Sequence, residues 1–249
     1  MTLSVFVPDG PGPFPVLWYL SGLTCTSANV TEKGEFRTAC SDAGVIFIAP
    51  DTSPRGDDVA DDESYDFGKG AGFYVNATEA PFAHHYQMQT YVEDELPALI
   101  AQHFPVDMTR QSITGHSMGG HGALTIGLRN PGRFKSISAF APICHPMTCA
   151  WGEKAFGGYL GDDRAAWRAY DAVAMIEDGA RVDKILVDQG TQDNFLKDQL
   201  DPDALAGACK AAAIDLTLRM QTGYDHSYFF ISTFMAEHVR WHAAALGAK

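Results

Sequence analysis

The sequence predicts an α/β protein with a mostly parallel central sheet and helices on both faces, and two observations lead to this class. From Val16 onward, short apolar runs typical of buried strands alternate with segments whose apolar residues have helical spacing. That order implies parallel strands joined by right-handed crossovers. In addition, the run Gly115–Gly119 joins one such strand to one such helix. No repeat, low-complexity tract or linker interrupts the chain, so one domain is expected over residues 1–249.

The first part of the chain is expected to hold strands and one helix. Leu3–Val7 alternates as an edge strand does, whereas Val16–Leu20 and Val45–Ala49 are apolar runs suited to buried strands. Thr31–Ala43 has helical spacing and is followed by Gly44, the residue type favoured just after a helix.

A long loop and a second helix follow. Asp51–Pro81 is rich in glycine and aspartate and has no regular period, and loops of this length in compact domains usually carry a function. Gln87–Phe104 is predicted to be helical, with a kink or a boundary at Pro97.

The later part of the chain continues the alternation, except that Pro142–Gly161 is expected to be irregular and aromatic-bearing. The other elements predicted here are strands at Ser136–Phe140, Ile185–Val187 and Leu216–Met220 and helices at Asp162–Ile176, Pro202–Ala213 and Ser227–Ala245.

The stretch Gln111–Leu124, QSITGHSMGGHGAL, supplies the main functional motif. Ser112–Thr114 suits a strand, Gly120–Arg129 suits a helix, and the run between them matches the G-x-S-x-G nucleophile elbow of the α/β-hydrolase fold. The elbow places Ser117 on a strained turn, and glycines on either side allow close backbone packing. With 24 glycines in the chain a chance match is a real alternative, but the flanking strand and helix favour a nucleophile.

A serine nucleophile needs a base to take its proton and a carboxylate to orient that base. In this fold the chain order is serine, acid, histidine. His226 lies in the loop after the last predicted strand and is the expected base. His238 and His242 lie on the final helix and are expected to be surface or packing residues.

The acid is less sharply defined, because Asp188, Asp193, Asp198 and Asp225 all lie in the two relevant loops. Asp225 is the neighbour of His226 and is poorly placed to reach its ring. Asp188 sits at a strand end, where it more often fixes a turn. Asp193 lies in mid-loop and is favoured over the other three.

The expected oxyanion hole consists of two backbone N–H groups, those of Leu23 and Met118. The loop Ser21–Cys25 lacks the HGGG pattern of lipases, so the assignment of Leu23 depends on its position after a strand.

The formal net charge of −13 argues against nucleic acid or an anionic membrane as a partner. It also means that an anionic substrate would need a local basic group. No stretch is apolar and long enough to span a bilayer, and the N-terminus lacks signal-peptide features. Five cysteines without a C-x-x-C pair predict reduced thiols in a cytoplasmic protein.

Runs along nearly the whole chain, taken together, resemble the S-formylglutathione hydrolase family, also called esterase D. These runs are SGLTCT (21–26), APDTSPRG (49–56), DFGKGAGFYVNATEAP (66–81), GHSMGGHGAL (115–124), SAFAPIC (138–144), WGEKAFGGYLG (151–161), DQGTQDNFL (188–196) and GYDHSYFFI (223–231). The resemblance implies a triad of Ser117, Asp193 and His226, an oxyanion hole at Leu23 and Met118, and no metal or organic cofactor. One departure is the N-terminus, which is usually longer in the family; this bears on the sheet edge and not on the triad.

The implied substrate is S-formylglutathione or another small acyl ester, cleaved through a formyl-enzyme intermediate. The loop Asp51–Pro81 and the segment Trp151–Gly161 are expected to form the acyl pocket and the glutathione cleft. Candidate aromatic walls, each equally suited to the core, are Tyr65, Phe67 and Trp151. Candidate partners for the glutathione carboxylates are Arg55, Lys69 and Lys154.

Several residues allow two interpretations. Cys25 is either a reactive thiol beside the site, as the family suggests, or an inert buried cysteine. The pair His84-His85 has no third ligand spaced to bind a metal, so a solvated loop is expected. His116 and His121 flank the elbow and are expected to pack or to support other groups. The remaining cysteines, expected to be core or neutral, are Cys40, Cys144, Cys149 and Cys209.

Other functions stay open at this point. The first is a general carboxylesterase or an acyltransferase of the mycolyl-transferase type. Such a transferase should have a long lipid groove, and the sequence shows no apolar stretch that would form one. The second is a non-catalytic binding protein with the same fold, which is disfavoured because serine, aspartate and histidine are all present. Members of the resembling family are often dimers, so a homodimer is one expectation.

Overall fold

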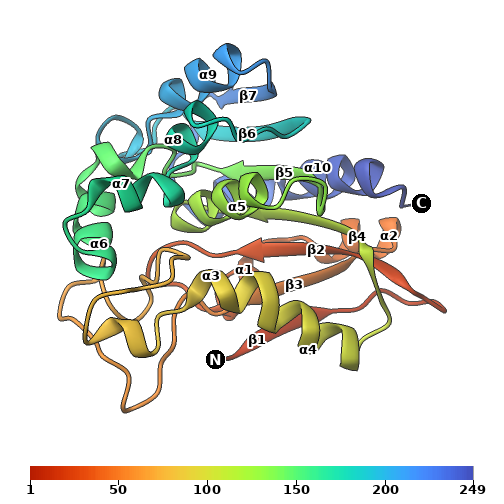
Figure 1. Cartoon of the computed structure of the whole chain (residues 1–249). Helices are drawn as coiled ribbons and strands as arrows, with labels where there is room; N and C mark the ends of the chain where they lie inside the picture. The colour runs from red at the N-terminus through yellow and green to blue at the C-terminus, as the bar shows by residue number, and fades with distance from the viewer. Residues whose placement is uncertain (249) are drawn as a thin grey trace.

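The computed structural model describes residues 1–248, and its centre is one seven-stranded sheet in the order β1-β3-β2-β4-β5-β6-β7 (Figure 1). Only β1 is antiparallel to its neighbour, β3, and the other pairs are parallel. The predicted mostly parallel sheet and the edge position of β1 are thereby confirmed. The strands are β1 (Leu3–Phe6), β2 (Phe14–Leu20), β3 (Ile46–Pro50), β4 (Val106–Gly115), β5 (Phe134–Phe140), β6 (Lys184–Gly190) and β7 (Asp215–Gln221).

The inner strands are buried on both faces, which explains why they read as continuous apolar runs. Every residue of β3 is buried, as are the last six of β2, whereas the edge strand β7 alternates between exposed and half-buried residues. Helices cover both faces (Figure 1): α5 packs on β4 and β5 with α8 beside it, and α10 packs with α2 behind the sheet. The helices are α1 (Ser27–Lys33), α2 (Arg37–Ala43), α3 (Met88–Thr90), α4 (Leu96–His103), α5 (Met118–Arg129), α6 (Ala150–Leu160), α7 (Arg164–Trp167), α8 (Ala172–Glu177), α9 (Pro202–Ala211) and α10 (Tyr228–Leu246).

The predicted single helix Thr31–Ala43 is wrong, because the chain turns between α1 and α2. Gly34 ends α1, and a Cβ atom there would lie 2.6 Å from the side chain of Val30. Glu35 follows with a φ of 54°, which a helix does not allow. The predicted role of Gly44 is confirmed, since it ends α2 in the left-handed conformation.

The prediction of a break near Pro97 is confirmed. The short α3 leads into a π-helical turn, η2 (Tyr91–Glu95), and α4 begins directly after it. Pro97 therefore sits in the first turn of α4, where a residue without an N–H is tolerated.

The prediction that Pro142–Gly161 is irregular is wrong, because α6 occupies its second half. Buried Trp151, Ala155 and Tyr159 recur with helical spacing, but the intervening glycines obscured the pattern. Gly152 is required by packing, since a Cβ atom there would lie 2.1 Å from the carbonyl oxygen of Pro146. The segment predicted as one helix, Asp162–Ile176, is also divided, into α7, the 3-10 turn η4 (Arg168–Tyr170) and α8.

The long loop Asp51–Pro81 holds no helix or strand, as predicted, and packs against α6. Phe67 from the loop lies with its ring centroid 4.5 Å from that of Tyr159 on α6 and 4.7 Å from that of Phe82. This aromatic contact fixes the loop beside the carboxyl ends of the strands. Within residues 1–248, no helix combines the length and the apolar character needed to cross a membrane.

Candidate active site

Ser117 occupies a strained turn between β4 and α5. Its φ of 58° and ψ of −120° lie outside the regions that L-residues favour, as expected for an elbow. Gly119 permits this turn, because a Cβ atom there would lie 2.0 Å from the carbonyl oxygen of Leu20. Gly115 is equally constrained, with only 2.1 Å to the carbonyl oxygen of Gly119. The spacing of glycines in the motif is therefore a requirement of backbone packing.

Asp193 and His226 form a close pair, with 2.6 Å between Asp193 Oδ2 and His226 Nδ1. Asp193 is held in place by the backbone N–H of Phe195, which donates to Oδ1 at 2.8 Å. The amide of Gln189 donates to Oδ2 at 3.1 Å. Of the four candidate aspartates, Asp193 is thus the one that the structure places on His226. Asp225 instead accepts hydrogen bonds from Ser227 within its own turn.

Asp188 lies inside β6 and does not fix a turn, which corrects the sequence interpretation. Arg219 on β7 holds it with contacts of 2.6 and 2.5 Å, and His238 Nε2 lies 3.0 Å from its Oδ2. Burial alone would raise the pKa of Asp188, but the hydrogen bonds from His238 and Arg219 outweigh it and lower that pKa. Asp188 is therefore a buried structural anion.

His238 and His242 are packing residues and not surface residues. Both are fully buried and lie on the face of α10 that meets the sheet. Ser138 Oγ lies 2.8 Å from His238 Nδ1 and 2.7 Å from His242 Nε2, and Ser136 Oγ lies 2.7 Å from His242 Nδ1. This hydrogen-bonded chain satisfies polar groups that would otherwise be buried without partners.

Ser117 and His226 line one cavity of about 200 Å³ at the carboxyl ends of the strands. Four residues predicted to lie at the site are also in its wall: Leu23, Cys25, Tyr65 and Trp151. The wall is completed by Gly22, Thr24, His116 and Phe195.

Phe195 is a wall residue that sequence reasoning missed. Its ring centroid lies 4.7 Å from that of Trp151 and 5.0 Å from that of His226. Tyr65 closes the same side, because its hydroxyl accepts a hydrogen bond of 3.1 Å from Trp151 Nε1. The position of Phe195 in the sequence, two residues after Asp193, is the feature that could have predicted a place at the site.

The loop that carries Leu23 lies directly against the elbow. A Cβ atom on Gly22 would lie 3.1 Å from Ser117 Cβ and 3.2 Å from the carbonyl oxygen of His116. In the described part of the chain, the backbone N–H groups of Leu23 and Met118 donate no hydrogen bond. Both are therefore available to an anion at Ser117, and Met118 is the first residue of α5, where the helix dipole favours negative charge.

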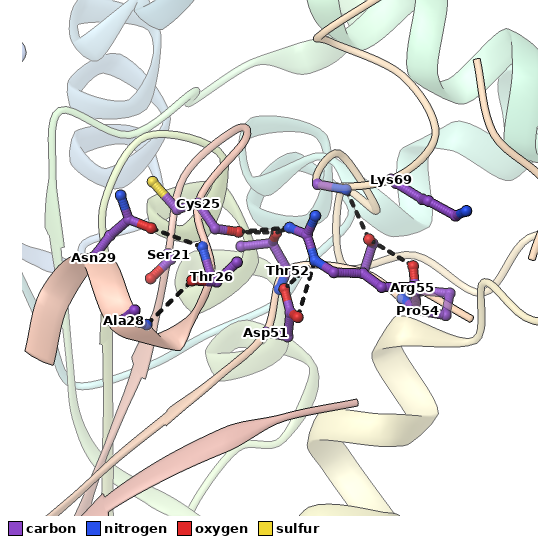
Figure 2. A network of polar contacts seen from close by, with 12 residues as sticks. Ser21, Cys25, Thr26, Ala28, Asn29, Asp51, Thr52, Pro54, Arg55 and Lys69 are labelled. Atoms are coloured by element: carbon purple, nitrogen blue, oxygen red, sulfur yellow. Dashed lines mark hydrogen bonds and ion pairs between the residues drawn. The ribbon is translucent and has the colours of Figure 1, made fainter. Parts of the chain in front are cut away.

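The thiol of Cys25 is protonated near neutral pH. Burial raises its pKa, and the backbone of Gly22 and the charges of Lys33 and Arg55 offset this only in part. A raised pKa disfavours the interpretation of Cys25 as a reactive thiol. Its carbonyl oxygen is a structural anchor, because it accepts hydrogen bonds from Arg55 and Thr52 (Figure 2).

The three predicted partners of glutathione carboxylates do not line this cavity, and their role stays a prediction. Arg55 Nε lies 2.9 Å from both carboxylate oxygens of Asp51 (Figure 2). The other two also face carboxylates, with Lys69 Nζ 3.9 Å from Asp61 and Lys154 Nζ 2.5 Å from Asp66. Aspartates of the long loop thus neutralise these cations locally.

Phe67, the third predicted aromatic wall, is a core residue in contact with Phe82 and Tyr159 and is absent from the cavity wall. It shapes the site only indirectly, by fixing the loop that carries Tyr65.

The histidines of the elbow are buried. Burial, followed by the charge of His226, holds the pKa of His116 well below its usual value, and its ring centroid lies 4.4 Å from that of His226. Burial lowers the pKa of His121 to about 4, and its Nε2 lies 3.0 Å from the carbonyl oxygen of Phe73. Both therefore pack as neutral rings. Among residues 1–248, no group of three or more His, Cys, Asp or Glu side chains is placed to hold a metal ion.

Comparison with known proteins relates the chain to esterases. The family model described as a putative esterase matches residues 1–241. Curated S-formylglutathione hydrolases from Paracoccus denitrificans and Mus musculus are each 53% identical, over 249 and 254 residues. The alignments cover 99% and 100% of this chain and 89% and 90% of the relatives.

A solved structure of an S-formylglutathione hydrolase from Agrobacterium tumefaciens is similarly close. It has a TM-score of 0.98 and 59% sequence identity, and the match covers 98% of this chain and 90% of that one. The predicted α/β-hydrolase fold is thereby confirmed. The chain belongs to the S-formylglutathione hydrolase family of esterases.

Proposed function

We propose that the chain hydrolyses S-formylglutathione to glutathione and formate, with Ser117, His226 and Asp193 as its catalytic triad. The observation that carries the proposal is the 2.6 Å contact between Asp193 and His226 beside the cavity that Ser117 lines. The substrate follows from relatives that bear this name and share about half of their residues with the chain.

In the first half of the reaction, Ser117 Oγ attacks the formyl carbon while His226 Nε2 takes the hydroxyl proton. Asp193 holds Nδ1–H and so fixes the tautomer that leaves Nε2 free to accept. The oxyanion of the tetrahedral intermediate accepts hydrogen bonds from the N–H groups of Leu23 and Met118. The intermediate collapses by breaking the carbon–sulfur bond, and His226 returns the proton to the glutathione sulfur.

In the second half, water replaces glutathione. His226 removes a proton from the water, which attacks the formyl ester of Ser117. Collapse releases formate and returns the proton to Ser117 Oγ. The described chain has no hydrogen bond between Ser117 and His226, and such bonds often tighten only when substrate is bound.

The cavity favours a short acyl group. Its volume is about 200 Å³, and the rings of Tyr65, Trp151 and Phe195 form one side. A formyl group fits easily, whereas a long acyl chain would need these rings to move. This observation supports a small-acyl hydrolase over an acyltransferase of the mycolyl-transferase type.

The decisive experiment measures hydrolysis of S-formylglutathione by the wild type and by Ser117→Ala. We expect rapid turnover by the wild type and a loss of at least about 10⁴-fold in the variant. A fluorophosphonate probe should label the wild type at Ser117 and leave the variant unlabelled. Full turnover by Ser117→Ala would refute Ser117 as the nucleophile, whereas a wild type without turnover would favour a non-catalytic binding protein.

A general carboxylesterase is the second candidate, and a comparison of kcat/KM separates the two. The proposed function requires a higher kcat/KM for S-formylglutathione than for 4-nitrophenyl acetate. We also propose that the protein acts in the cytoplasm, where thiols stay reduced, because all five cysteines are unpaired. The net charge of −13 supports a small molecule and not nucleic acid as its partner.

A further inference from the structure

A second hollow, of about 660 Å³, lies beside the proposed active site. It is formed where the end of α1 faces the start of α10, by Lys33, Glu35, Ser227, Tyr228, Phe229 and Ser232. A role for this hollow rests on the proposed function, because it concerns the part of the substrate that does not react.

The hollow adjoins the site along the chain, and one aromatic contact links the two in space, although their walls share no residue. Ser227 and Tyr228 directly follow His226, and the ring centroid of Tyr228 lies 6.2 Å from that of His116 in the cavity wall. On the other side, the charge of Lys33 lowers the pKa of the Cys25 thiol, which also lines the cavity. A substrate whose acyl group lies at Ser117 can therefore extend toward Lys33.

Two opposite charges in the hollow have no ionic partner within the described residues. Lys33 and Glu35 are both exposed and form no salt bridge, unlike Arg55, Lys69 and Lys154. In a chain of net charge −13, an unpaired ammonium beside the site supplies the local basic group that an anionic substrate requires.

The position of Glu35 is maintained at an energetic cost. Its φ of 54° is unfavourable for a residue with a Cβ atom, and the preceding Gly34 N–H is bonded to the carbonyl oxygen of Val30 at 2.8 Å. Such conformations are uncommon in residues with a side chain and cluster at functional sites. The turn between α1 and α2 therefore presents Glu35 next to Lys33 in a defined place.

Phe229 adds an apolar surface to the same hollow. It is 84% exposed, more than any other large hydrophobic residue among residues 1–248. This ring offers apolar surface that the methylene groups of a peptide-like ligand can cover.

We propose that this hollow binds the γ-glutamyl end of the glutathione ester, with Lys33 meeting its α-carboxylate and Glu35 its α-ammonium group. The two side chains match the two charges of a free amino-acid head group, and Phe229 covers the methylenes between that head group and the cysteine. Lys33 and Glu35 are in this sense specificity-determining residues, which act on substrate binding and not on the chemical step.

The test compares Lys33→Met with Lys210→Met, because Lys210 is also an exposed lysine in the last turn of a helix but lies on α9, outside the hollow. We expect Lys33→Met to raise KM for S-formylglutathione about fivefold or more with little change in kcat. The S-formyl thioester of cysteinylglycine, which lacks the γ-glutamyl group, should show a much smaller effect. Glu35→Gln should reproduce this dependence on substrate.

Two results would overturn the proposal. One is a KM for S-formylglutathione that Lys33→Met changes no more than Lys210→Met does. The other is an equal rise in KM for the truncated thioester. A wild type that does not turn over S-formylglutathione would instead refute the proposed function, and calorimetric binding of S-methylglutathione to both lysine variants would then test the hollow alone.

Discussion

His238 Nε2 lies 3.0 Å from Asp188 Oδ2, and both side chains are fully buried. In a second pair, Asp193 and His226, the histidine lines the cavity. These are two of three aspartate–histidine pairs among the described residues, the third being Asp171 and His145, and of these first two only the second is beside Ser117. Substitutions in the two pairs should therefore have different effects, on stability for the first pair and on catalysis for the second.

Replacing the first pair's acid should affect stability. In Asp188→Asn, the buried His238 and the guanidinium of Arg219 lose the anion that compensates them, which typically costs about 3–5 kcal/mol. The lowered pKa of Asp188 means that wild-type stability from this group is present above the unfolded pKa and is lost as pH falls through the folded pKa. Urea unfolding at neutral pH measures the effect; an unchanged unfolding free energy would contradict this account.

Replacing the second pair's acid should affect catalysis. Asp193→Asn removes the group that fixes the tautomer of His226, and we expect kcat to fall by roughly 10³- to 10⁴-fold. Turnover of S-formylglutathione measures this loss. Asp188→Asn is the matched control, since at a temperature where it stays folded it should retain kcat within several-fold. Equal losses in the two variants would show that the pairs are not functionally distinct.

Gly119 should tolerate no side chain. A Cβ atom there would lie 2.0 Å from the carbonyl oxygen of Leu20, so Gly119→Ala must displace the elbow or β2. We expect loss of activity and of soluble protein. Gly207→Ala is the control, because nothing lies within 4 Å of its Cβ position on α9. That change should stabilise the protein by up to about 1 kcal/mol, because alanine favours a helix. Thermal unfolding of both variants gives the comparison.

Much of the fold was predictable because the buried strands have a direct sequence signature. Val16–Leu20 and Ile46–Pro50 are fully buried on both faces and are therefore continuously apolar. The helix α6 was not predicted because it contains Gly152, which allows close packing against Pro146. In the sequence, a glycine required for packing cannot be told apart from one that breaks a helix. The single domain over residues 1–249 stays a prediction.

The site was predictable to the extent that chain order and loop position define it. Asp193 was preferred by its place in a loop, and the structure puts it on His226. Arg55 and Lys154 pair with Asp51 and Asp66, and these partners can be identified only when the loop is folded. Ion pairs between side chains are a property of the tertiary structure and leave little pattern in the sequence.

Tyr65 should control the length of the acyl group. It is exposed at the cavity mouth and contacts Trp151 through its hydroxyl, so its removal opens the cavity at little cost in stability. We expect Tyr65→Ala to raise the ratio of kcat/KM for 4-nitrophenyl butyrate over 4-nitrophenyl acetate about three- to tenfold. Tyr65→Phe keeps the ring and should leave the ratio unchanged. A shift of the same size in both variants would assign the effect to the hydroxyl.

Four buried histidines should make the protein less stable in mild acid. Burial lowers the pKa of His116, His121, His238 and His242 in the folded chain, with that of His121 at about 4. Their unfolded pKa is about 6.5, so below that pH the unfolded chain binds more protons and the folded state loses up to about 1.4 kcal/mol per histidine and pH unit. His145 acts in the opposite sense, because the hydrogen bond to Asp171 raises its pKa.

Urea unfolding at pH 7.0 and 5.5 tests this balance. Four histidines have a lowered pKa and one has a raised pKa. We therefore expect the unfolding free energy to fall by at least about 2 kcal/mol from pH 7.0 to pH 5.5. Histidine NMR provides the control, since the ring signal of His121 should not titrate above about pH 5. An unfolding free energy that stays level or rises toward pH 5.5 would mean that these rings are protonated inside the fold, and the neutral packing of the elbow and of α10 would have to be abandoned.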